Sequence, residues 1–232
     1  MPRRHFLERK RRAHSLKESS AGGIVAVLLA AGSASRFGSA KQLAPIAGVA
    51  LVRRAAQAIA ATGAELLVVT GAYAGDVAAA LSGISARLMH NPQWQLGMGE
   101  SIACGARELL NRVAGPSACL LCLADQPLIG AAQLQRLLDA AAADATRIIA
   151  SDHGAILGPP CLFPAEFLVE LAQLSGAKGA RVLLERHRSR VTEVAMPEAA
   201  LDIDAPEDYA RALQLLEPAA ATAALTPPRN SA

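Results

Sequence analysis

Short apolar runs alternate with longer amphipathic stretches along most of this chain. The runs at 24–29, 65–70 and 118–124 have the length of buried strands, and 87–90, 147–150 and 191–194 predict further strands. Helices are predicted at 49–61, 75–81, 101–113, 130–143, 164–174, after Gly179, and at 206–216. This alternation predicts an α/β fold, a Rossmann-like, doubly wound, mostly parallel sheet in a single domain. Such sheets bind ligands beyond the carboxyl ends of their strands.

Length and composition are typical of one cytoplasmic domain. The 232 residues suffice for one core, built from Ala, Leu, Val and Ile because 52% of residues are hydrophobic and only 3% aromatic. No apolar run approaches a membrane span and no signal-peptide core is present. We therefore expect a soluble, cytoplasmic protein without a membrane partner.

Basic charge is concentrated at one end of the chain. Residues 1–20 have a net charge of +5 in a chain of net charge +3, so the remainder is slightly acidic and no nucleic-acid partner is expected for it. Residues 1–22 are predicted to be a disordered basic extension, with contact to RNA or a membrane surface as the alternative. Residues 23–216 are the predicted domain, and 217–232 a disordered Ala/Pro-rich tail.

Cys119 and Cys122 have the spacing of a redox or zinc motif. They lie, however, inside the apolar run 118–124, where residues three apart on a strand point to opposite faces. We interpret both as core residues, and with Cys104 and Cys161 they suit a reducing compartment.

The loop after the first predicted strand has the chemistry of a phosphate site. Gly32 and Gly38 let backbone N–H groups approach an anion, and Arg36 and Lys41 add positive charge. The spacing is neither that of a Walker A loop nor the Gly-x-Gly-x-x-Gly of dinucleotide loops. The alternative is an ordinary glycine-rich turn with solvated basic residues.

Carboxylates are the second candidate feature. Asp125 ends the run 118–124, where a buried carboxylate needs a partner such as Mg²⁺ held jointly with substrate phosphates; capping of the next helix is the alternative. Asp202 and Asp204 fall on the same side of an extended backbone and are spaced to share one cation, although Pro206 also marks a plain helix start.

Two further segments have less specific signals. Ser101 is predicted to begin a helix whose free N–H groups face a phosphate or a base, or to be an ordinary N-cap. Residues 151–161 are predicted to be irregular, and His153 within them is interpreted as incidental.

Four motifs together resemble those of the molybdenum-cofactor cytidylyltransferases, which are nucleotidyltransferases with a Rossmann-like fold that work alongside xanthine-dehydrogenase-type enzymes. The motifs are the loop 29–41, the Asn-x-x-Trp-x-x-Gly-Met-x-x-Ser stretch at 91–101, Asp125-Gln126-Pro127, and the Asp-x-Asp-x-Pro-Glu-Asp stretch at 202–208. The resemblance covers roughly residues 24–216. Guanylyltransferase relatives usually carry Gly-Gly where this chain has Ala31-Gly32, which favours CTP over GTP.

The resemblance implies a set of functional residues. Arg36, Lys41 and Asp125 are the expected catalytic residues, and Asp125, Asp202 and Asp204 the expected ligands of Mg²⁺ or Mn²⁺. The nucleotide is expected to contact Leu29, Ala30, Ala31, Gly32, Ser33, Ser35, Arg36, Gly38, Lys41, Gly71, Gly97, Met98 and Ser101. The acceptor is expected at Gly158, Pro160 and Arg181, although a solvated helix terminus is an equal alternative for Arg181.

The chain departs from the family pattern on the acceptor side. It has Ala177 where relatives usually have Asp in a Gly-Asp-x-Gly-Ala-Arg motif, and Ala205 replaces a threonine. The hypothesis is transfer of a cytidylyl group from CTP to the molybdenum cofactor with release of pyrophosphate, with a xanthine-dehydrogenase-type enzyme or its maturation chaperone as a possible partner. The alternatives are a GTP-using or other small-phosphate nucleotidyltransferase, and a non-catalytic cofactor carrier; a dehydrogenase is disfavoured by the missing dinucleotide loop.

Overall fold

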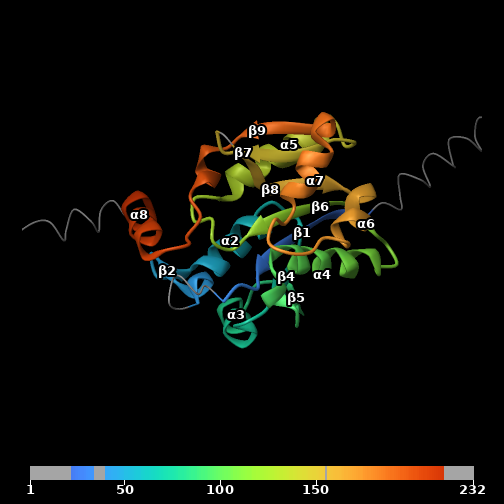
Figure 1. The fold of residues 1–232 in the computed structure, drawn as a ribbon. Coiled ribbons are helices and arrows are strands. Elements are labelled where there is room, and N and C mark those ends of the chain that lie inside the picture. The colour runs from blue at the N-terminus through green and yellow to red at the C-terminus, as the bar shows by residue number, and fades with distance from the viewer. Residues whose placement is uncertain (1–21, 34–39, 155, 217–232) are drawn as a thin grey trace, which may run out of the picture.

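The computed structural model describes residues 22–33, 40–154 and 156–216. Ser35, Arg36 and Gly38 lie outside the described residues, as do 1–21 of the predicted extension and the predicted tail 217–232. Figure 1 shows the described part as a central sheet with helices on both sides. None of its helices is long and apolar enough to span a bilayer.

The main sheet has seven strands in the order β5-β4-β1-β6-β8-β7-β9. Their bounds are β1 (Gly22–Ala30), β4 (Glu65–Thr70), β5 (Arg87–His90), β6 (Pro116–Leu123), β7 (Ile148–Asp152), β8 (Leu157–Pro164) and β9 (Val191–Ala195). β8 is antiparallel to both neighbours and the other pairs are parallel, so the prediction of a mostly parallel sheet is confirmed. The strands β2 (Pro45–Ile46) and β3 (Val49–Ala50) form a separate hairpin.

Helices cover both faces of the sheet, as in a doubly wound fold. They are α2 (Leu51–Ala60), α3 (Ala74–Ala80), α4 (Met98–Leu110), α5 (Ala131–Ala143), α6 (Leu168–Leu171) and α7 (Arg181–Arg186), whereas α8 (Pro206–Leu216) packs beside β2. Alternate residues of β1 point to opposite faces: Val27 and Leu29 pack with α4, α6 and α7, whereas Leu28 packs with α2, α3 and α5. Cys119 and Cys122 likewise belong to opposite faces, and both are buried free thiols, so their interpretation as core residues is confirmed.

Several predicted boundaries are wrong. The segment 151–161 is not irregular: β7 continues to Asp152 and β8 begins at Leu157. Pro159 and Pro160, which suggested a loop, fall in a register shift where β7 pairs with Gly158 and then with Cys161, so their missing N–H groups interrupt no regular ladder. The predicted helix at 49 begins at Leu51 because the two preceding residues form β3.

The chain builds the sheet outward in both directions from β1. β4 follows β1 on one side and β6 lies on the other, so a crevice opens at the carboxyl ends of β1 and β6. The segment that follows β9 returns to this crevice, because the Ile203 N–H donates to the Asp125 carbonyl oxygen at 2.9 Å. Ile203 and Leu201 are buried against Ile46 of β2, beside which α8 lies in Figure 1.

Candidate active site

A cavity of about 300 Å³ opens at the carboxyl ends of β1 and β6. Its walls come from the loop after β1, the loop after β6, the η1 turn (Lys41–Leu43), the η2 turn (Trp94–Leu96) and the start of α4. The predicted nucleotide-binding residues that line it are Leu29, Ala30, Ala31, Gly32, Ser33, Lys41, Gly97, Met98 and Ser101, and Asp125 lines it too. Residues predicted from distant stretches of sequence therefore share one cavity.

Lys41 bridges two of the predicted carboxylates. Its Nζ lies 2.7 Å from Asp125 Oδ2 and 2.6 Å from Asp204 Oδ1. The Lys41 side chain is only 16% exposed, whereas that of Asp204 is 59% exposed. Burial alone would lower the pKa of Lys41, but the charges and hydrogen bonds of the two carboxylates outweigh burial and raise it. Lys41 is therefore held as a cation.

Asp202 lies in the same cluster but is not paired with a cation among the residues that the structure describes. Burial raises the pKa of Asp202 to about 6, and the charge of Asp125 adds to the rise, while a hydrogen bond from Gln126 opposes it. Asp202 Oδ1 and Asp125 Oδ1 are both buried and have no hydrogen-bond partner within 22–33, 40–154 and 156–216. Asp202 and Asp204 lie in the segment 201–204, which belongs to no helix or strand.

A side-chain hydrogen bond and close packing support the backbone of the loop after β1. The buried Gln42 side chain donates its Nε2–H to the Gly32 carbonyl oxygen at 3.0 Å. Gly71 does not line the cavity; a Cβ at Gly71 would lie 2.4 Å from the Ala31 carbonyl oxygen and 2.7 Å from Trp94 Cγ, so glycine is required for the close packing beneath the loop. The role of Gly71 here is support of the cavity wall.

Ser101 does not begin a helix, contrary to the prediction, because α4 starts at Met98. The buried Ser101 hydroxyl instead accepts a hydrogen bond from Asn91 Nδ2 at 3.1 Å, which ties the first turn of α4 to the end of β5. Gly97 has φ +118°, and a Cβ there would lie 2.6 Å from the Gly176 carbonyl oxygen. The start of α4 is thus packed against the loop that carries Ala177.

A second cavity of about 470 Å³ adjoins the first and shares Met98 and Leu123 with it. Gly158, Arg181 and Asp202 line it, together with Ala177 and Lys178. Pro160, the third predicted acceptor residue, is buried and does not line it; its carbonyl oxygen accepts a 2.6 Å hydrogen bond from Ser151.

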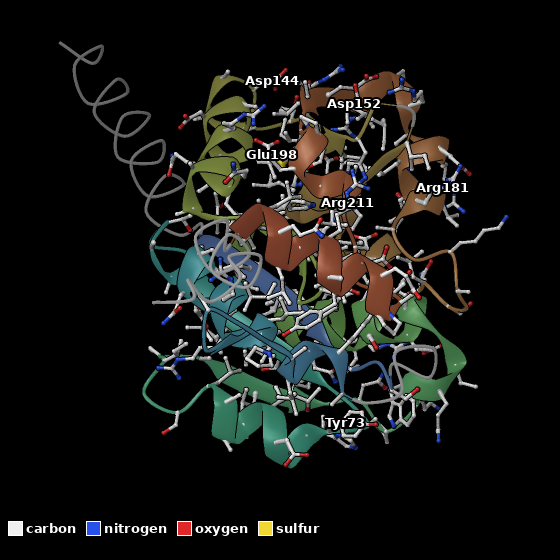
Figure 2. All side chains as sticks on the ribbon, turned by 90° about the vertical axis from the view of Figure 1, so that its left-hand side faces the viewer. Tyr73, Asp144, Asp152, Arg181, Glu198 and Arg211 are labelled. Carbon is white, nitrogen blue, oxygen red and sulfur yellow. The ribbon has the colours of Figure 1, made fainter. Side chains whose placement is uncertain are left out.

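Arg181, in the wall of the second cavity, lies far from the loop after β4 that carries Tyr73. Tyr73, whose hydroxyl donates to the Ser33 carbonyl oxygen at 3.4 Å, and Arg181 are well separated in Figure 2, Tyr73 in its lower half and Arg181 in its upper half. Arg181 is exposed and paired with Glu185 at 2.9 Å.

Two positioning residues were not predicted. Gln126 is 96% buried and donates to the carbonyl oxygens of Pro159 and Ala199, at 3.0 and 3.2 Å, so it joins β8 and the segment before Asp202 to the loop of Asp125. His153, interpreted as incidental, lies in the second cavity wall, and its Nε2 carries the hydrogen because the Pro159 carbonyl at 3.1 Å can only accept. Burial lowers the pKa of His153, which favours the neutral ring.

The chain is similar in sequence and fold to known proteins. The model of the MobA-like NTP transferase domain matches residues 26–191. Nicotine blue oxidoreductase of Paenarthrobacter nicotinovorans is 31% identical over 179 residues, 70% of this chain and 82% of that protein. A Methanothermobacter nucleotidyl transferase has a TM-score of 0.72 at 26% identity, over 85% of this chain and 99% of its own. Rv0371c of Mycobacterium tuberculosis, solved in a complex with manganese, has a TM-score of 0.66 at 28% identity, over 83% and 98%.

Proposed function

We propose, for a chain that belongs to the MobA-like NTP transferase domain family, that CTP is its nucleotide substrate and the molybdenum cofactor its acceptor. Family and fold are those of nucleotidyltransferases. The observation that carries the proposal is the convergence of Lys41 and Asp125 on one cavity at the ends of β1 and β6, with Asp204 bound to Lys41. Opposite charges at such a crevice suit a triphosphate that binds with a divalent cation.

Ala31 supports CTP as the nucleotide. It is buried in the cavity wall next to Gly32, where guanylyltransferases of the resembled family usually have a second glycine. A methyl group at this position narrows the cavity beside the backbone, which favours a pyrimidine over the larger purine.

The second cavity supports an acceptor that approaches from the side of β8. It adjoins the nucleotide cavity at Met98 and Leu123, so an acceptor phosphate placed between the cavities meets the end of a bound nucleotide. We expect Gly158 and Arg181 to contact this acceptor, and a molybdoenzyme or its maturation chaperone to receive the product. Lys178 and Arg181 supply positive charge in a wall where Ala177 has replaced the expected acid.

The carboxylates fit a hard divalent cation such as Mg²⁺ or Mn²⁺. Asp125 Oδ1 and Asp202 Oδ1 are buried without partners, which is the donor chemistry such ions prefer. In the part of the chain that the structure describes, no group of three His, Cys, Asp or Glu residues is arranged to hold a metal, so water and substrate phosphate oxygens would supply the other ligands. The manganese complex of Rv0371c supports the same metal chemistry. When bound, the ion neutralises phosphate charge.

The residues of the chain then act mainly by position and charge. The acceptor phosphate attacks the α-phosphorus of CTP, and a new P–O bond forms as the bond to pyrophosphate breaks. Lys41 offsets the negative charge that develops on the α-phosphate, and the backbone N–H groups at Gly32 and Ser33 hold the outer phosphates. Arg36 is expected to assist them.

The test supplies the purified full chain with each of the four NTPs, Mg²⁺ and molybdenum cofactor, and measures pyrophosphate and the dinucleotide product. The expected result is turnover with CTP and with none of the other three NTPs. Turnover with GTP would contradict the role given to Ala31, and tight binding of the finished cofactor without turnover would identify a carrier.

The name of one relative favours a second candidate, an oxidoreductase, because nicotine blue oxidoreductase is 31% identical to this chain. A parallel assay with NADH or NADPH and an electron-accepting dye, run beside the pyrophosphate assay, discriminates the two. Consumption of NADH or NADPH with an electron-accepting dye, and no pyrophosphate with any NTP, would replace the transferase by an oxidoreductase.

A further inference from the structure

Lys41 is the cation within the acidic cluster that Asp125, Asp202 and Asp204 form. Its Nζ contacts Asp125 at 2.7 Å and Asp204 at 2.6 Å, and at 16% exposure this pair is screened less than a surface ion pair. Asp125 is also the carboxylate to which the proposed function assigns the metal. Lysine and metal therefore compete for one residue.

Asp202 and Asp204 differ in the partners of their carboxylate oxygens, which indicates different roles. In the described part of the chain, Asp202 Oδ1 is buried and has no hydrogen-bond partner, and the same holds for Asp125 Oδ1. Asp204 is 59% exposed and bound to Lys41. The unsatisfied oxygens, which a cation would satisfy, thus belong to Asp125 and Asp202, whereas Asp204 is engaged with the lysine.

We propose that Lys41 is the built-in counter-ion of this cluster in the nucleotide-free protein, and that the site accepts a divalent cation only when a triphosphate draws Lys41 away from Asp125 and Asp204. The inference rests on the proposed function in taking the cavity as a triphosphate site. Asp204 is then a positioning residue that holds Lys41, and Asp125 and Asp202 are the metal ligands.

The electrostatic reason is direct. With Lys41 in place, a divalent cation at Asp125 lies close to an ammonium group in a partly buried site, where like charges repel strongly. Once phosphate oxygens bind the Lys41 ammonium group, it no longer compensates the negative charge of Asp125. The same phosphates offer further oxygen ligands to the metal. Metal and nucleotide binding are then coupled, and the coupling is reciprocal.

The test titrates the full chain with Mn²⁺ alone and follows the electron paramagnetic resonance signal of free Mn²⁺. Lys41→Met is expected to bind Mn²⁺ about ten-fold more tightly than the wild type without nucleotide. Lys178→Met removes the same charge from the neighbouring cavity wall and is expected to change the affinity by no more than about two-fold. An affinity of Lys41→Met no higher than that of the wild type would overturn the inference.

A second titration includes a CTP analogue with a methylene group between the α- and β-phosphates, which cannot be cleaved. The analogue is expected to raise the Mn²⁺ affinity of the wild type by about ten-fold or more and that of Lys41→Met by much less. Equal Mn²⁺ affinity of the wild type with and without the analogue contradicts the coupling.

Asp204→Asn gives an independent arm on an exposed side chain. Unchanged or tighter Mn²⁺ binding is expected, because Asp204 holds the lysine; a loss of about ten-fold would make Asp204 a metal ligand and overturn its assignment. Failure of CTP transfer with these Mn²⁺ results intact overturns the proposed reaction only. Normal CTP transfer without coupling overturns this inference only.

Discussion

At Asp202 a carboxyl group is kept in a partly buried place beside a second carboxylate, Asp125, and its pKa is raised to about 6. The folded state therefore binds a proton more tightly than the unfolded chain does, so the stability of the protein falls as pH rises from about 4 to about 6. Such a loss of stability is expected at a site whose carboxylates bind a cation.

Asp202→Asn is accordingly expected to stabilise the apoprotein. The amide has no charge to desolvate, so the free energy of unfolding should rise by about 1–2 kcal/mol at pH 8 and stay unchanged near pH 4, where the wild-type carboxyl is protonated. Urea unfolding at both pH values measures this, with Asp139→Asn, a surface carboxylate on α5, as the control for charge loss. Destabilisation by Asp202→Asn at pH 8 is the opposite outcome.

Asp125→Ala tests the other half of the carboxylate pair. The variant should fold, because Lys41 keeps its contact with Asp204, but it should lose pyrophosphate release from CTP by at least about a hundred-fold. Circular dichroism and a coupled pyrophosphate assay measure the two properties. Near-normal turnover would refute the assignment of Asp125 to the metal.

At the scale of elements, the sequence was informative where a strand is parallel and apolar. β4 has the predicted bounds, because its apolar run, flanked by alanine and glycine, leaves few alternatives, and the shorter β5, with Arg87 and His90 at its ends, also has them. β8 was missed because Gly158 and two prolines are typical of loops, and only the register shift opposite β7 accommodates them. Local propensity contains no information about that pairing.

The join between α4 and the loop at 175–179 can be tested through Gly97. Gly97→Ala places a Cβ 2.6 Å from the Gly176 carbonyl at a φ of +118°, so we expect a loss of about 2 kcal/mol or more of stability. Gly75→Ala in α3 faces open space and should instead stabilise by about 0.5–1 kcal/mol. Thermal unfolding of both variants gives the comparison, and equal effects would contradict the packing described for Gly97.

At the scale of the whole molecule, the site depends on contacts that no local pattern reveals. Charge and spacing predicted Lys41, Asp125 and Asp204 separately, but not that one ammonium group binds both carboxylates, Asp204 being 163 residues from the lysine. Gln126 was equally hidden, because its importance comes from the carbonyls of β8 and Ala199 that surround it. The order of the strands around β1 brings these segments together.

We expect the triphosphate of CTP to bind in the cavity that Lys41 and Asp125 share. Trp94, the only tryptophan of the chain, lines that cavity, so its fluorescence reports binding. The most direct measurement is a titration of the full chain with CTP and Mg²⁺ in wild type and Lys41→Met. The account predicts a saturable change at Trp94, CTP affinity about ten-fold lower in the variant, and much weaker binding of CMP, which lacks the outer phosphates. Equal CTP affinity of the two proteins, or equal affinity for CTP and CMP, would contradict it.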